Sequence, residues 1–257
     1  MTRILIVNAD DFGRSDGVNR GVIQAHEKGI VTSASLMVRY AAAADAAEYG
    51  RHRPQLSLGL HVDLGEWLYQ DGTWTAVYEL DQFEDEVERQ LDAFRSLVPR
   101  DPTHLDSHQN RLFQSNKDLF EVLLRVAHEN NLPVLIPRGW FADFPFLEKS
   151  IGPSDVVIDR VITIEPGVPP SKWNDFYKDS LNHLEPGVTE FVIHLAYADA
   201  EMKAATRERD TWGADWRQRD FDFFSSAEFQ KLLRDNKIHL ITWRDVGRTM
   251  NPPAKSE

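Results

Sequence analysis

The sequence predicts an α/β protein that folds as a single-domain, irregular (β/α) barrel, similar to a TIM barrel, with its active site at the C-terminal ends of the strands. Short runs of apolar and β-branched residues alternate with stretches of helical spacing, which is typical of βαβ units and a parallel sheet. The chain has 257 residues, a length that one such barrel commonly occupies. We expect the barrel to span residues 1–250, and residues 251–257 to form a flexible tail.

The first βα unit shows the pattern. Ile4–Val7 is apolar throughout, as is typical of a strand that is buried on both faces. The segment from Val18 to Ile30 then places its apolar residues on one helical face. Asp16 is the expected N-cap of this helix, and Gly29 is expected to follow its C-terminus.

The other elements follow from the same two patterns. Strands are predicted at Val31–Val38, Leu56–Val62, Thr103–Asp106, Val134–Ile136, Val156–Ile162, Thr189–His194 and Ile238–Ile241. Helices are predicted at Ala41–Tyr49, Phe83–Leu97, Asn116–Glu129, Trp173–Leu184 and Ala227–Arg234.

Two long connections, Leu64–Leu80 and Leu195–Phe221, interrupt this alternation. Long loops in compact domains are usually functional or disordered, and the aromatic residues in these two favour lids over the active site. The aromatics are Trp67, Tyr69, Trp74 and Tyr78 in the first connection, and Tyr197, Trp212, Trp216 and Phe221 in the second.

Composition and charge exclude several classes of protein. Lys and Arg number 29 against 41 Asp and Glu, so the net charge is -12, which does not favour binding to nucleic acid or to a membrane. Because the chain has no cysteine, any metal must be held by His, Asp or Glu. The apolar stretch after Met1 is too short for a signal peptide or a membrane span, so we expect a cytoplasmic protein.

Polar side chains follow five of the predicted strands. In a barrel the C-terminal ends of the strands form one rim, so these side chains should meet there. The residues are Asp10, Asp11, His61, His108, Arg138 and His194.

Each of these residues also has a structural interpretation. Asp10 and Asp11 could form an Asx-turn, and a lone His that closes an apolar run is usually a core residue. The spacing His104-x-Asp106-x-His108 is harder to dismiss, because it places all three side chains on one face of a strand, where they must pair or bind something. One Asp and two His suit a divalent metal. A second carboxylate could then take a proton from a metal-activated water, and another His could protonate the leaving group.

Several motifs resemble those of the YdjC-like carbohydrate deacetylases, which are related to chito-oligosaccharide and hopanoid-pathway deacetylases. The motifs are Ile4–Gly13, Gly17–Gly21, Ala25–Ser33, Gly59–His61 and His104–Gln109, and the resemblance extends from Arg3 to about His194. Three positions depart from the family pattern: Asp63, Asn110, and the pair Leu195-Ala196 after His194.

The resemblance implies an irregular (β/α) barrel with one divalent metal that hydrolyses the N-acetyl group of a sugar. By position, Asp11, His61 and His108 would be the metal ligands, and Asp10 the general base. His194 would be the acid for the leaving group, and Arg138 would orient Asp10 or contact the substrate.

The sequence therefore predicts a metal-dependent hydrolase that removes an N-acetyl group from an amino sugar or chito-oligosaccharide, with aromatics of the long connections stacking on the sugar. The resemblance favours Mg²⁺, whereas ligand chemistry alone favours Zn²⁺ and also allows other transition metals. A homodimer could form through the outer helices. Two alternatives stay open: a metal-dependent phosphoesterase or other hydrolase on the same barrel, and a catalytically silent saccharide-binding protein. Few basic residues lie near the expected rim, Arg111 and Arg138 being the obvious ones, which argues against an anionic substrate.

Overall fold

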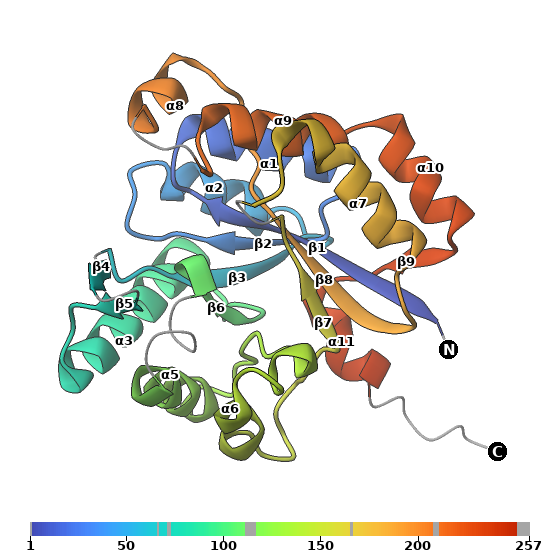
Figure 1. Cartoon of the computed structure of the whole chain (residues 1–257). Coiled ribbons are helices and arrows are strands. Elements are labelled where there is room, and N and C mark those ends of the chain that lie inside the picture. The colour runs from blue at the N-terminus through green and yellow to red at the C-terminus, as the bar shows by residue number, and fades with distance from the viewer. Residues whose placement is uncertain are drawn as a thin grey trace.

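A curled sheet of parallel strands lies at the centre of the molecule, with helices packed around it (Figure 1). The computed structural model describes residues 2–65, 67–70, 73–110, 117–164, 167–207 and 211–250. The strand order is β6-β3-β2-β1-β8-β7, and β9 also pairs with β1. The predicted α/β class and parallel sheet are confirmed. The strands are β1 (Arg3–Phe12), β2 (Ser33–Leu36), β3 (Ser57–Val62), β6 (Leu105–Ser107), β7 (Arg160–Ile162), β8 (Gly187–Ile193) and β9 (Ile238–Leu240), and a separate antiparallel hairpin is formed by β4 (Trp67–Gln70) and β5 (Thr73–Ala76).

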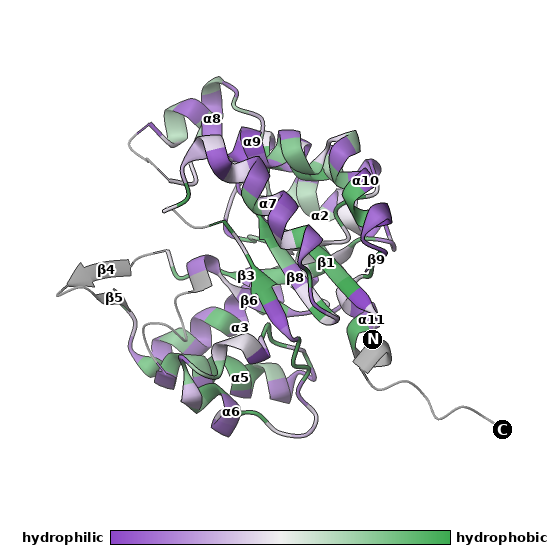
Figure 2. Cartoon of the chain, turned by 45° about the vertical axis from the view of Figure 1, so that its right-hand side comes forward, coloured by the Kyte–Doolittle hydropathy of each residue, from purple (hydrophilic) through white to green (hydrophobic). Residues whose placement is uncertain are grey.

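Helices cover the sheet, with α1, α2, α7, α9 and α10 on one side in Figure 1 and α3, α5 and α6 on another. Hydrophobic residues run along the strands, and hydrophilic ones gather on the outward faces of the helices (Figure 2). The helices are α1 (Asp16–Glu27), α2 (Ala43–Arg51), α3 (Leu80–Leu97), α5 (Lys117–Glu129), α6 (Pro145–Ser150), α7 (Trp173–Asn182), α8 (Ala200–Ala205), α9 (Ala214–Phe224), α10 (Ala227–Asp235) and α11 (Trp243–Met250), with short 3₁₀ turns η1 (His108–Asn110), η2 (Arg138–Trp140) and η3 (Pro170–Lys172). In the described parts of the chain, no helix combines the length and apolar character needed to span a bilayer.

β1 is the central strand. β8 pairs with it along residues 3–9, while β9 and β2 share its other side, β9 at residues 3–5 and β2 towards the C-terminal end. Successive side chains point to opposite faces of a strand. Leu5, Val7 and Ala9 accordingly join the larger core, whereas Ile6 belongs to a second cluster with Trp243 and Val246 of α11.

The wall of the barrel is irregular between β6 and β7. The predicted strand Val134–Ile136 is wrong as a strand, because this segment makes only isolated bridges, Leu105 with Val134 and Pro137 with Ile158. Pro133 and Pro137 flank it and lack the N–H donors that a continuous ladder needs. The segment nevertheless links β6 to the residues just before β7, as expected for an irregular barrel.

The start of α1 differs slightly from the prediction. Ser15, not Asp16, is the N-cap, and its side chain accepts a hydrogen bond from the Val18 N–H at 3.3 Å. Asp16 is the first helical residue, where a carboxylate is favourable near the positive end of the helix dipole. Gly29 follows the helix with a φ of +78°, as predicted.

The second long connection is largely helical where the structure describes it. It contains α8 and α9, and both Trp216 and Phe221 of α9 are buried in the core. Two charged residues, Arg217 and Asp220, also lie on the buried face of α9. They interrupt the regular spacing of apolar residues from which a helix is predicted. In the first connection, Tyr78 donates a hydrogen bond to the Leu64 carbonyl at 2.6 Å. The side chains of Trp67, Tyr69 and Trp74, and the predicted tail 251–257, lie outside the described residues.

β3 passes so close to the buried ring of His104 that a larger residue than Gly59 would collide with it. A Cβ atom added there would lie 2.6 Å from both ring nitrogens of His104, which is 0% exposed. We expect Gly59→Ala to lower the free energy of unfolding by about 1–3 kcal/mol, which is the usual cost of overpacking. Urea denaturation measures this change. Gly167→Ala is the matched control, since nothing lies within 4 Å of its added Cβ. Equal unfolding midpoints for the two variants would contradict this account.

Candidate metal centre and active site

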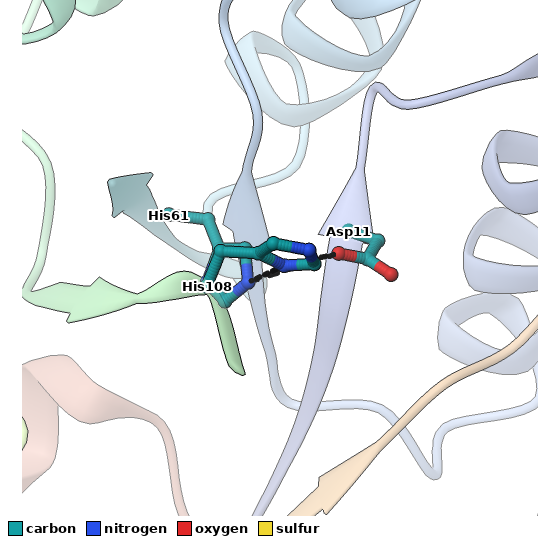
Figure 3. Close-up of side chains that lie close together, drawn as sticks. All are labelled: Asp11, His61 and His108. Atoms are coloured by element: carbon teal, nitrogen blue, oxygen red, sulfur yellow. Dashed lines mark hydrogen bonds and ion pairs between the residues drawn. The ribbon is translucent and has the colours of Figure 1, made fainter. Parts of the chain in front are cut away.

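Asp11, His61 and His108 come together at one edge of the sheet, at the C-terminal ends of β1 and β3 and directly after β6 (Figure 3). Asp11 belongs to β1, His61 to β3, and His108 begins η1 directly after β6. Asp11 Oδ1 lies 3.1 Å from His108 Nδ1 and 3.7 Å from His61 Nε2, and the two ring nitrogens are 3.1 Å apart. The expectation that these three strand ends meet is confirmed.

The backbone of Asp11 is left-handed, with a φ of +65°. This conformation is uncommon for residues other than Gly, although Asp and Asn tolerate it best. The β1–β2 register shifts between Ala9 and Phe12, and the Arg14 N–H donates to the Asp11 carbonyl at 3.0 Å. The irregular end of β1 thus allows the consecutive residues Asp10 and Asp11 both to face the site.

The donor set of this cluster fits a divalent cation. Asp11 is fully buried and, within the part of the chain that the structure describes, its Oδ1 accepts no aligned hydrogen bond, although two imidazole nitrogens face it. Three ligand atoms that lie within 4.8 Å of one another, one carboxylate oxygen and two imidazole nitrogens, suit a metal with further positions open for water and substrate. Because buried acceptor atoms in proteins normally have a partner, Asp11 Oδ1 is suited to bind a cation.

A carboxylate behind His61 orients its ring. Asp106 Oδ1 accepts a hydrogen bond from His61 Nδ1 at 2.7 Å, so Nε2 faces Asp11 and His108. Burial alone would lower the pKa of His61, but the carboxylates of Asp106 and Asp10 raise it to about 10. The carboxylates thus favour a positive charge at Nε2, which a bound cation would supply in place of a proton. Asp106 also accepts a hydrogen bond from Ser35 at 2.6 Å.

Asp10 lies beside the cluster without belonging to the Asp11, His61 and His108 set. Its Oδ1 accepts a hydrogen bond from Asn8 Nδ2 at 2.8 Å, and its Oδ2 lies 3.8 Å from His61 Nε2 and 3.9 Å from His194 Nε2. Burial raises the pKa of Asp10 to about 8, and the neighbouring carboxylates of Asp106 and Asp11 act in the same direction. This carboxyl group therefore has a strong tendency to take up a proton at neutral pH.

His194 follows β8, and its ring, like that of His61, approaches Asp10 Oδ2. Its backbone N–H donates to Asp220 Oδ2 at 3.2 Å, and its ring centre lies 6.1 Å from the ring centre of Trp212. Burial lowers the pKa of His194 to about 3, and the nearby Arg217 guanidinium contributes. His194 is thus a neutral imidazole in this structure.

Arg217 on α9 is the important site residue that the sequence did not reveal. Its Nη2 donates to Asp11 Oδ2, and its Nε donates to the Trp212 carbonyl at 2.9 Å. Burial would raise the pKa of Asp11, but Arg217 and His108 hold it well below its ordinary value. No motif marks Arg217 in the sequence, and it lies in the connection that was predicted to be a lid.

Arg138 begins the short 3₁₀ turn η2. It is exposed on η2, with its guanidinium carbon 5.9 Å from the ring centre of Phe141. In the described part of the chain, Asn8, His61 and His194 contact the Asp10 carboxylate, and orientation of Asp10 by Arg138 stays a prediction. A substrate contact by Arg138 stays a prediction.

His104 does not share the site with Asp106 and His108. Its ring is stacked on Trp243 with centres 4.6 Å apart, and burial lowers the pKa of His104 to about 4. Its Nε2 lies 3.9 Å from Asp106 Oδ2. The period-two pattern thus supplies a neutral core imidazole, a carboxylate that orients His61, and a candidate metal ligand.

Two of the three departures from the family pattern, at Asp63 and at Leu195-Ala196, have structural roles. Asp63 accepts hydrogen bonds from the Tyr40 hydroxyl at 3.0 Å and the Gly65 N–H at 2.8 Å. Leu195-Ala196 is buried against α1, where a Cβ added at Gly21 would lie 3.1 Å from the Ala196 Cα. The departure after His194 therefore leaves a well-packed loop. The side chain of Asn110 is not among those described.

The sequence was compared with protein families and with individual relatives. The model of the family described as YdjC-like protein matches residues 4–235. A carbohydrate deacetylase from Brevibacillus brevis is 30% identical over 271 residues, covering 95% of this chain and 99% of the relative. A chitooligosaccharide deacetylase from Serratia marcescens is 34% identical over 157 residues, 54% of this chain, and the match spans only 61% of that relative.

Solved structures with the same fold were also found. A proposed cellobiose-phosphate cleavage protein from Enterococcus faecalis superimposes with a TM-score of 0.75 at 22% identity, covering 95% of this chain and 99% of the other. A family 4 carbohydrate esterase from Streptomyces lividans, in complex with acetate, gives a TM-score of 0.54 at 11% identity, with coverages of 93% and 91%. At these identities the likeness is one of fold.

Proposed function

The chain belongs to the YdjC-like protein family, and from this we propose that it is a metal-dependent hydrolase that removes the N-acetyl group from an amino sugar or chito-oligosaccharide. The observation that carries the proposal is the convergence of Asp11, His61 and His108, with Asp10 and His194 beside them. The names of the relatives from Brevibacillus and Serratia support the same reaction.

Asp11, His61 and His108 would hold the cation. When bound, it would polarise the acetamide carbonyl, acidify the attacking water and lower the pKa of Asp10. We favour Mg²⁺ from the family resemblance, while the two imidazoles also suit Zn²⁺ and other transition metals.

Asp10 is the proposed general base. Its Oδ2 is free of the Asn8 hydrogen bond, which engages Oδ1, and faces His61 and His194. In the proposed reaction this oxygen takes the proton of the water that attacks the carbonyl carbon.

His194 is the proposed acid for the departing amine. Because the imidazole is neutral in this structure, it must gain a proton before it can donate one. Asp10 Oδ2, at 3.9 Å from Nε2, can supply the proton taken from water. The proton then passes to the amine nitrogen as the C–N bond breaks, so that amide and water give amine and acetate. Trp212, next to His194, is a proposed wall for the sugar ring, and Arg138 a proposed outer contact.

The direct test is acetate release by metal-loaded protein from N-acetylglucosamine and its oligomers, with phosphorylated substrates assayed in parallel. We expect acetate release that is lost on chelation and restored by one divalent metal. Phosphate release without acetate release would identify a phosphoesterase instead. Saccharide binding without turnover under any metal would identify a silent binding protein.

His194→Ala should separate the acid role from metal binding. We expect unchanged metal content and a fall in kcat of about 10²-fold or more on sugar acetamides, the usual contribution of general acid catalysis. The fall should be much smaller for an activated acetyl ester, whose leaving group needs no proton. An equal loss on both substrates, measured as kcat, would count against this role.

A further inference from the structure

Two buried charged residues of α9, Arg217 and Asp220, contact the site from one side. They are three positions apart, which places them on the same face of the helix, and each is almost fully buried. The carbonyl of Arg217 also accepts a hydrogen bond from the Ala196 N–H at 3.3 Å. The helix is thus tied both to β1 and to the segment that follows β8.

Arg217 acts on one oxygen of Asp11. Its Nη2 donates to Oδ2, which also lies 3.5 Å from Arg14 Nη1, and Oδ1 is turned towards His61 and His108. Its Nε donates in addition to the Trp212 carbonyl, so the guanidinium is fixed at two points. The planar guanidinium reaches the two acceptors with two different nitrogens held in a fixed geometry, whereas an ammonium group has a single nitrogen whose donors rotate.

Asp220 acts on the backbone of His194. Its Oδ2 accepts the His194 N–H at 3.2 Å, and its Oδ1 accepts the Tyr177 hydroxyl at 2.8 Å. Tyr177 is itself buried, with its ring stacked on Phe223 at 5.2 Å between centres. Asp220 therefore ties the residue proposed as the acid to a rigid aromatic layer.

We propose that Arg217 and Asp220 are positioning residues: Arg217 makes Asp11 present a single oxygen to the metal, and Asp220 fixes His194 opposite Asp10. The Asp220 part rests on the proposed function, whereas the Arg217 part is tested by metal binding alone.

The proposed role of Arg217 predicts the direction in which metal affinity changes when this residue is replaced. Arg217→Met removes a positive charge from beside the metal ligand, so a purely electrostatic role requires tighter metal binding. Positioning requires the opposite, and we expect the affinity to fall about 10–100-fold, the usual effect of losing a group that orients a ligand. Calorimetric titration of the metal-free protein with Zn²⁺ or Co²⁺ measures this. Arg219→Met, an exposed residue of the same helix, is the control. Unchanged or tighter binding by Arg217→Met would overturn the proposal.

A second variant distinguishes the loss of positioning from a folding defect. Arg217→Lys keeps the charge but loses the fork, and we expect weaker binding together with a changed intensity of the visible Co²⁺ bands, which report coordination number. The Arg219→Met protein should keep the wild-type spectrum. A wild-type spectrum and affinity in Arg217→Lys would show that charge alone suffices, against the proposal.

The proposed role of Asp220 is tested by comparing Asp220→Ala with the conservative variant Asp220→Asn. Asp220→Ala should lower kcat about tenfold or more through misplacement of His194, while KM and metal affinity stay within twofold of wild type. Asp220→Asn can still accept the His194 N–H and should retain most of kcat. Loss of metal affinity in Asp220→Ala, or an equal loss of kcat in Asp220→Asn, would contradict positioning. If the wild type releases no acetate, the proposed function fails and the Arg217 measurements alone decide the inference.

Discussion

Asp10→Asn should bind the same divalent metal as the wild type and lose about 10²–10⁴-fold in kcat, the usual contribution of a general base. An amide has nearly the same shape as the carboxyl group, and its oxygen can still accept the Asn8 hydrogen bond that engages Asp10 in the structure. It cannot, however, take a proton from water. The measurements are acetate release under saturating substrate and metal content after gel filtration.

Asp16→Asn is the matched control for this change, because Asp16 is exposed at the start of α1. It should keep both metal and turnover. Wild-type kcat in Asp10→Asn would rule out Asp10 as the base. Loss of metal in that variant would instead assign Asp10 to the ligand set.

Asp11→Ala should abolish stoichiometric metal binding and destabilise the metal-free protein. The change removes one of three ligands and leaves the buried Arg217 guanidinium without its carboxylate. Breaking a buried ion pair from one side costs about 3–5 kcal/mol. Metal analysis by mass spectrometry and urea denaturation in the presence of chelator measure the two effects.

A double variant separates the ion pair from other consequences of the change. Asp11→Ala combined with Arg217→Met should recover part of the lost stability, because the more deeply buried of the two guanidinium groups facing Asp11 is then gone and only the Arg14 group, 3.5 Å from Asp11 Oδ2, loses its partner. It should not recover metal binding. Asp11→Asn preserves a side chain that tolerates the positive φ of this position. Full metal occupancy in Asp11→Ala would contradict the proposed ligand set.

Much of the candidate site could be predicted because parallel strands bring their C-terminal ends to one rim. Asp11, His61 and His108 lie far apart in the sequence, yet each follows or closes an apolar run. That rule predicts their convergence without side-chain detail. It does not predict Arg217, which lies on a helix and reaches Asp11 from 206 positions away.

The errors have equally specific causes. Val134–Ile136 has the apolar character of a strand, but the flanking prolines limit it to bridges. α9 was missed because Arg217 and Asp220 occupy its buried face among the aromatics. Arg138 follows an apolar run as the candidate ligands do and lies exposed on η2, and its predicted role is untested.

The central place of β1 has a consequence for how the protein acquires its fold. β1 pairs with β8 and β9, which come much later in the chain and end at residues 193 and 240. A nascent chain that has emerged only through residue 186 therefore carries β1 with one edge largely unpaired. Pairing over such sequence separations slows folding and prolongs the exposure of apolar edges. We expect refolding of the whole chain, followed by the recovery of native fluorescence, to be slow.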